Sequence, residues 1–246
     1  MSPDGPAATS AAVPDDFDAR VEGIAALGEP LRRALYRFVI AQPGPVSRAD
    51  AAEGAGVATH TAKFHLDRLV EDGLLEVEFR RPAGRGGPGA GRPNKLYRRS
   101  RRELAVSLPE RDYELAGRLL AGAVTAAERD GVPVGEALRA GARDVGRAIG
   151  HEVRIRAGAR PSRSSLFAAT DHVLRAHGYE PRRDGESVTL ANCPFHALAQ
   201  DYTELVCGMN FELMGGLVDE VGVSALEPVL DPAPGRCCVR LQRAAG

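Results

Sequence analysis

The sequence lacks any apolar run that approaches the roughly 20 residues needed to cross a bilayer. Between Met1 and Pro14 it also lacks the basic start and apolar core of a secretory signal peptide. We therefore expect a cytoplasmic protein. Hydrophobic residues make up 43% of the chain and charged residues 26%, as in folded globular proteins. A length of 246 residues allows two modest domains, each with its own core.

Cysteine is missing from the first 190 residues, and the four cysteines, Cys193, Cys207, Cys237 and Cys238, all follow that point. Because cytosolic thiols stay reduced, this grouping favours metal binding or redox reactivity over structural disulfides. The sequence has no Cys-x-x-Cys pair and no nucleotide-binding glycine motif. We therefore expect no enzymatic activity, and a thiol redox enzyme that uses Cys237-Cys238 is the alternative of another class.

The first hundred residues follow a plan of short helices and then two strands. Residues 1–15, rich in Ala, Pro and Ser, are predicted to be a disordered tail. Ser47 and Asp50 are spaced as a capping box at the start of a helix. Apolar spacing predicts the remaining elements. They are helices at 16–27, 31–39 and 59–71, and strands at 74–79 and 94–97 joined by a Gly- and Pro-rich loop.

Residues 57–69, Val-Ala-Thr-His-Thr-Ala-Lys-Phe-His-Leu-Asp-Arg-Leu, followed by Glu71-Asp72-Gly73-Leu74-Leu75, resemble the helix and strand start of ArsR-type regulators. The resemblance covers residues 24–100 and implies a winged helix-turn-helix domain, which we place at residues 16–100. In such proteins the helix that starts at Thr59 enters the major groove of DNA.

The residues themselves agree with this interpretation. If Ala62, Leu66 and Leu69 face the core, the other face presents hydroxyls and cations suited to phosphates and base edges. From Arg80 to Arg102 the chain has nine Lys or Arg residues and no Asp or Glu, which is either a solvated linker or a backbone-binding wing. Gly91-Arg92-Pro93 suits a narrow minor groove. The predicted DNA contacts are Thr59, His60, Thr61, Lys63, Arg68, Arg85, Arg92 and Lys95.

Residues 101–160 read as a helical linker or dimerisation region. The long helix predicted at 134–156 carries an apolar stripe made of Leu138, Ala142, Val145, Ile149 and Val153. Operators with two half-sites require a dimer, so we assign one or both helices of this region to a homodimer interface. The alternative is that these helices cover the protein's own sheet.

Residues 161–246 are predicted to form a small α+β sensor domain. Asp184-Gly185 marks a hairpin turn, and Thr203 is a candidate N-cap. The expected elements are a helix at 164–177, strands at 179–183 and 187–190, helices at 194–201 and 203–221, and strands at 223–230 and 236–242. The fold class as a whole is therefore α+β, with an N-terminal winged helix-turn-helix, a helical segment and a sensor domain that carries the cysteines.

Three cysteines are the candidate metal ligands: Cys193, Cys207 and Cys237. Pro194 is a favoured first helical residue, which places the Cys193 sulfur by a helix N-terminus where a thiolate is stabilised. Strand alternation turns Cys237 inward and leaves Cys238 as a spare. Thiolates suit zinc and iron–sulfur clusters alike, and the long spacing does not choose between them. The alternative is that these cysteines bind no metal and are small side chains buried in the core.

A winged helix followed by long helices and three spaced C-terminal cysteines resembles the SufR-type repressors of iron–sulfur-cluster assembly operons, from about residue 24 to the end. This resemblance implies a homodimeric repressor whose Cys193, Cys207 and Cys237 ligate a 4Fe–4S cluster. It leaves three candidates for the fourth ligand, which are His196, Cys238 and a group that does not come from the protein. The alternative is a winged-helix regulator whose C-terminal domain is stabilised by zinc or senses a small molecule.

Overall fold

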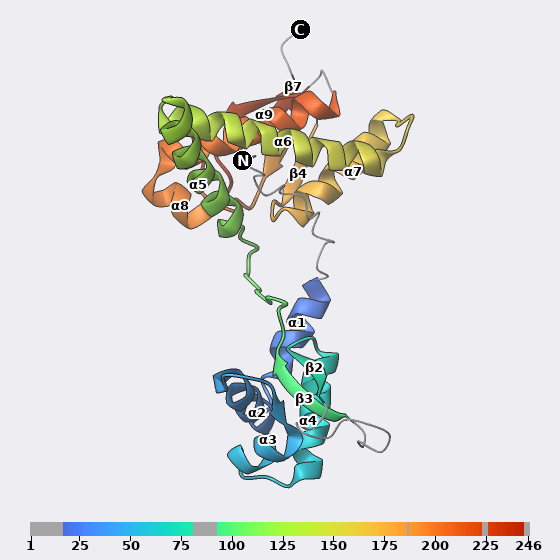
Figure 1. Cartoon of the computed structure of the whole chain (residues 1–246). Coiled ribbons are helices and arrows are strands. Elements are labelled where there is room, and N and C mark those ends of the chain that lie inside the picture. The colour runs from blue at the N-terminus through green and yellow to red at the C-terminus, as the bar shows by residue number, and fades with distance from the viewer. Residues whose placement is uncertain (1–16, 81–92, 186, 223–225, 244–246) are drawn as a thin grey trace. The chain divides into compact units, whose positions relative to one another are not determined.

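The computed structural model describes residues 17–80, 93–185, 187–222 and 226–243 (Figure 1). The chain divides into two compact units, Met1–Val106 and Ser107–Gly246. In the part of the chain that is described, no helix is both long enough and apolar enough to span a membrane.

The first unit has the predicted plan of helix, turn and helix followed by a hairpin. Its helices are α1 (Phe17–Ala26), α2 (Pro30–Ala41), α3 (Arg48–Gly54) and α4 (Thr59–Glu71). Its strands are β1 (Val46–Ser47), β2 (Leu75–Arg80) and β3 (Asn94–Arg99), which form an antiparallel sheet in the order β1-β3-β2. Sequence reasoning missed β1, because two residues are too short to show an alternating pattern.

Local sequence signals explain how α3 and α4 are placed. The predicted capping box is confirmed: Asp50 N donates to Ser47 Oγ at 3.2 Å, and Ser47 N donates to the Asp50 carboxylate at 3.1 Å. Helix α4 buries Ala62, Leu66 and Leu69 completely, as its periodicity predicts. Its opposite face is therefore turned to solvent.

The first unit extends past the predicted boundary at residue 100. Arg20 Nη1 of α1 donates to Ala105 O at 3.2 Å. A Cβ added to Gly23 would lie 2.6 Å from Leu104 Cδ1, so Leu104 packs closely on α1. The chain after β3 thus returns to α1, and residues 101–106 belong to this unit rather than to a helical linker.

The second unit combines a sheet with helices. Its helices are α5 (Tyr113–Asp130), α6 (Val134–Ala157), α7 (Arg163–Ala176), α8 (His196–Asp201) and α9 (Thr203–Val221). Its strands are β4 (Pro181–Asp184), β5 (Ser187–Leu190), β6 (Leu226–Leu230) and β7 (Val239–Arg243), in an antiparallel sheet of order β4-β5-β7-β6. Helix α9 packs on β6 and β7, and α6 packs on α9 (Figure 1).

The crossing of α6 and α9 is unusually close because glycines form it. A Cβ on Gly146 of α6 would lie 2.0 Å from Leu213 O, and a Cβ on Gly216 of α9 would lie 2.0 Å from Arg143 O. The Arg143 guanidinium then reaches carboxylates of Glu212 and Asp219 on α9, each at 2.7 Å. The two helices are locked together by backbone contact and ion pairs.

This crossing shows that the apolar stripe of α6 packs inside the chain, whereas the sequence-based prediction assigned it to a homodimer interface. Leu138, Ala142, Ile149 and Val153 are buried inside the chain, and Val145 is half-buried against the same core. They are therefore not available to a partner subunit. Residues 107–160 form one unit with the sheet, so the predicted boundary at residue 160 does not separate two units.

Two details around α8 and α9 differ from the sequence-based prediction. Helix α8 begins at His196 rather than at Pro194. Thr203 does not cap α9, because its hydroxyl donates back to Ala199 O at 2.7 Å and Tyr202 occupies the N-cap position.

Candidate nucleic-acid interface and thiol site

The exposed face of α4 carries most of the predicted DNA contacts that the structure describes. Thr59 and His60 in its first turn are exposed, and Thr61 is half-buried. Ala58 at the N-cap has no polar side chain to hydrogen-bond the first-turn amides. The amides are thus open to an anion, which is the arrangement that binds a phosphate at a helix N-terminus.

One carboxylate ties α4 to the hairpin. Asp67 accepts hydrogen bonds from Lys63 Nζ at 2.9 Å, Lys95 Nζ at 2.5 Å and Tyr97 Oη at 2.8 Å. Burial opposes the ionisation of Asp67, but the hydrogen bonds from Lys95, Lys63 and Tyr97 outweigh it and lower its pKa to about 2. Burial, together with this carboxylate, raises the pKa of Tyr97. Two predicted DNA contacts, Lys63 on the helix and Lys95 on the wing strand β3, are therefore held by one anion.

The remaining predicted contacts fall into different positions. Arg68 lies near the C-terminal end of α4 and pairs with Asp72 at 3.1 Å and Glu71 at 3.4 Å. Arg85 and Arg92 lie outside the described residues. Sequence reasoning missed Phe64, whose ring is 66% exposed on the same face as His60 and Lys63. A large apolar residue followed by a histidine inside a recognition-helix pattern was the available signal.

The four cysteine thiols, which we call the thiol site, come from three separate segments and meet as two pairs. Cys193 and Cys237 act on each other's pKa, and Cys238 acts on the pKa of Cys207, so the two thiols of each pair lie near each other. The pairs are near enough for Cys193 to act electrostatically on Cys207. Cys193, Cys207 and Cys237 are buried, and Cys238 is half-buried. Among the described residues, no group of three or more His, Cys, Asp or Glu side chains is arranged to hold a metal ion.

The two candidate fourth ligands of the thiol site lie in different surroundings. Cys238 is half-buried and acts on the pKa of Cys207, so it lies near that thiol. His196 is exposed at the start of α8. The predicted alternation is confirmed in burial, since Cys237 is 2% exposed and Val239 is fully buried, although both cysteines precede β7 rather than lie within it.

The thiols have unequal acidities. The hydrogen bond from Cys237 lowers the pKa of Cys193 against the effect of burial, and the Phe195 amide and the Arg111 guanidinium lower it further. Its hydrogen bond to Cys193, together with burial, raises the pKa of Cys237. Burial, followed by Cys238, raises the pKa of Cys207 to about 12. Of the three buried thiols, Cys193 is therefore the one whose pKa is lowered, and the thiolate is the form that binds metals.

Two buried asparagines serve the thiol site. In the described part of the chain, Asn192 and Asn210 are the buried polar side chains. Asn210 Nδ2 donates to Cys237 Sγ at 3.1 Å, and Tyr179 Oη donates to Asn210 Oδ1 at 2.5 Å. Because an unpaired buried amide is costly, a network of this kind fixes the position of the sulfur.

Asn192 joins the thiol site to the segment that enters α5. Its Nδ2 donates to Glu110 O at 2.8 Å and to Gly178 O at 2.6 Å. Arg111 Nη1 donates to Asn192 Oδ1 and, at 3.1 Å, to Cys193 O. Asp112 N donates to Pro194 O at 3.1 Å. We call these contacts the Arg111–Asn192 clamp.

Comparison with known protein families decides the nature of the first unit. Residues 27–78 match the family model described as a helix-turn-helix domain. This segment is a helix-turn-helix domain. The match spans α2 to β2 and includes α4, and it supports the expected relation to ArsR-type regulators. A helix-turn-helix domain is typical of DNA-binding transcriptional regulators.

The other comparisons carry little weight. No curated protein matches the chain significantly. Among solved structures, the crystal structure of human N-acetylserotonin methyltransferase in complex with SAM aligns at 20% identity with a TM-score of 0.23. The alignment covers 65% of this chain and 54% of that one, so the chain matches about half of that protein's length. At this TM-score the likeness supports no conclusion about fold or activity.

Proposed function

We propose that this protein is a homodimeric transcriptional repressor in which the thiol site holds an iron–sulfur cluster and controls operator binding. The helix-turn-helix domain supplies DNA binding. In the proposal, the first turn of α4 contacts phosphates and base edges, while Lys95 on the wing contacts the DNA backbone. The dimer is proposed because operators of such proteins have two half-sites.

The thiol site offers the type of donor that ligates an iron–sulfur cluster, although, among the described residues, its thiols are not arranged to hold a metal ion. Cys193, Cys207 and Cys237 would be its ligands, and Cys238 is a better candidate for the fourth position than the exposed His196 because it lies near Cys207. When bound, the cluster supplies a centre that oxidants destroy. The protein supplies three buried thiols, a lowered pKa at Cys193, and the Asn210 amide that orients the Cys237 sulfur.

The Arg111–Asn192 clamp is the observation that carries the regulatory part of the proposal. It attaches residues 110–112 to the backbone on either side of Cys193. These residues continue directly from the end of the first unit at Val106. A change in the position of Cys193 therefore acts on the segment that leads to the DNA-binding domain.

An arginine exchange tests this coupling. Arg111→Met removes the guanidinium but keeps the aliphatic stem, and Arg118→Met changes an exposed arginine of α5 that pairs with Glu114. We expect both proteins to bind DNA when isolated without oxygen. The DNA affinity of Arg118→Met should fall on oxidation as in the parent, whereas that of Arg111→Met should change much less. An equal response in both variants would remove the clamp from the proposal.

Zinc is the second candidate for the thiol site, since the same thiolates bind it. In that case the metal would hold the site together without responding to oxidants. Metal analysis of the purified protein separates the two: iron with equimolar sulfide supports the cluster, and zinc without sulfide supports the alternative.

A further inference from the structure

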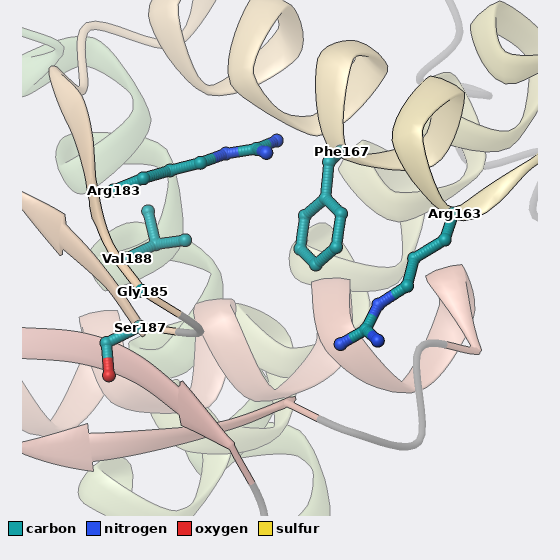
Figure 2. Close-up of a pocket in the computed structure, with 6 residues that line it drawn as sticks. All are labelled: Arg163, Phe167, Arg183, Gly185, Ser187 and Val188. Atoms are coloured by element: carbon teal, nitrogen blue, oxygen red, sulfur yellow. The ribbon is translucent and has the colours of Figure 1, made fainter.

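The second unit has a cavity away from the thiol site, at the start of α7. It opens between the first turns of that helix and the β4–β5 hairpin, and its volume is about 180 Å³. The residues that line it are Arg163, Phe167, Arg183, Gly185, Ser187 and Val188 (Figure 2).

Two arginines converge on one aromatic ring in this cavity. The Arg183 guanidinium lies 4.4 Å from the centroid of the Phe167 ring, and the Arg163 guanidinium lies 5.6 Å from it. Figure 2 shows that they reach the ring from different elements, Arg183 from β4 and Arg163 from α7. A ring face attracts a cation but carries no net charge, so the Arg183 guanidinium keeps its formal charge and its capacity to bind an anion.

The rest of the cavity wall includes an apolar surface. Val188 is buried, and its side chain lies on the same side of the strand as Arg183 and Phe167 in Figure 2. A dry cavity of roughly 150 Å³ accepts a benzene molecule. About 180 Å³ therefore has room for one six-membered ring with a small substituent.

We infer that this cavity binds a small molecule in which a carboxylate or phosphate is attached to a flat apolar ring. The ring would lie against Phe167 and Val188, and the anionic group would meet the Arg183 guanidinium. Guanidinium groups bind carboxylates and phosphates through paired hydrogen bonds, which gives the site its selectivity for anions.

The cavity and the thiol site share strand β5. Val188 pairs with Leu241 of β7, and at the other end of the strand Cys237 N donates to Leu190 O at 2.8 Å. Two residues after β5 the chain reaches Asn192 and Cys193. A ligand at Val188 therefore acts on the strand that positions two of the thiols, which gives the sensor domain a second input if the proposed function holds.

Ligand-detected NMR on the full-length protein as purified tests the site. The probes are benzoate and phenyl phosphate, with benzyl alcohol as the neutral molecule of similar shape. We expect at least one of the two anions to bind at least about tenfold more tightly than benzyl alcohol, the difference that one charge-assisted hydrogen bond provides. Comparing benzoate with phenyl phosphate identifies the preferred anionic group.

Matched arginine variants locate the binding. Arg183→Gln should weaken binding of the preferred anion at least about tenfold. Arg182→Gln, which changes the exposed neighbour on the same strand that pairs with Glu180, should leave it unchanged. Binding of both anions no tighter than that of benzyl alcohol, or equal loss in the two variants, would overturn the inference. Neither outcome depends on the metal content, so it is separate from a failure of the cluster proposal.

Discussion

The outer face of α4 and the thiol site differ in how their polar groups are balanced. At the outer face of α4, Lys63 of the helix and Lys95 of β3 share the Asp67 carboxylate at the edge of solvent. In the second unit, three of the four thiols are buried, and the Cys237 sulfur accepts hydrogen bonds from the neutral Asn210 amide and the Val239 N–H. The first arrangement leaves cations available to an outside anion. The second excludes water from groups that are reactive only as thiolates.

This difference has consequences for how each site tolerates change. Exposed ion pairs contribute little energy individually, so each substitution on the DNA-binding face should lower DNA affinity by a small amount. DNA affinity should also depend strongly on salt concentration. A buried site that needs several thiols at once should lose its metal when any one of these thiols is replaced. The predictions below test this contrast, beginning with the largest expected effect.

Gly216→Ala should unfold or strongly destabilise the second unit and leave the first unit folded. The added methyl would meet Arg143 O, a backbone atom that cannot move without separating α6 from α9. We expect a loss of about 3 kcal/mol, the upper part of the range for overpacked sites. Urea unfolding measures it. The matched control is Gly117→Ala on α5, where a Cβ meets nothing and should stabilise the helix by about 1 kcal/mol.

Single cysteine exchanges should remove most of the iron. Cys193→Ser, Cys207→Ser and Cys237→Ser each remove a proposed ligand, and Cys238→Ser removes the proposed fourth one. His196→Ala is the control, and it should keep the iron of the parent protein because this side chain is exposed. Iron and sulfide analysis of each anaerobically purified protein compares the cysteine variants with this control. Iron loss in His196→Ala together with retention in Cys238→Ser would reverse the assignment of the fourth ligand.

Asp67→Ala should weaken DNA binding about tenfold, the equivalent of about 1.4 kcal/mol and of one charge-assisted hydrogen bond. Removing a negative charge from a DNA-facing surface should, on charge alone, strengthen binding. We expect the opposite because Asp67 holds Lys95 and Tyr97 of the wing against α4. Glu71→Ala, one turn further along the helix, is the control for the charge effect. Fluorescence anisotropy with selected genomic fragments measures both, and tighter binding by Asp67→Ala would contradict the positioning role.

Acid should destabilise the first unit through the same carboxylate. The pKa of Asp67 is lowered to about 2 from its ordinary value of 3.8. A lowered pKa stabilises the fold above the ordinary value, and this stability is lost as the pH falls from about 4 towards 2. We expect a difference of about 1 kcal/mol from Asp67→Ala at neutral pH, because about a quarter of the side chain is open to solvent. The difference should vanish near pH 2, and a constant difference would exclude this ionisation as its cause.

Much of the local structure could be predicted because the signals lie close together in sequence. The Ser47–Asp50 capping box and the buried face of α4 depend on spacings of three or four residues. The inward position of Cys237 depends on alternation along a short segment. In each case the physical cause acts within one element.

Features that depend on how elements meet could not be predicted. The sequence gives no sign that Asp67 would serve both α4 and β3, or that Cys238 would meet Cys207, because both contacts need the tertiary arrangement. The α6 stripe is equally compatible with a partner helix and with α9. The stripe packs on α9 because the glycines at the crossing allow the backbones of α6 and α9 to come into contact.

The central claim is that the thiol site controls DNA binding by the helix-turn-helix domain. One sample of anaerobically purified full-length protein tests it most directly, by its absorption spectrum, its iron, sulfide and zinc content, and its DNA affinity before and after oxidation. The account predicts a brown protein with iron and sulfide whose DNA affinity falls when the cluster is lost. A colourless protein without iron, with DNA binding unchanged by oxidation, would contradict it.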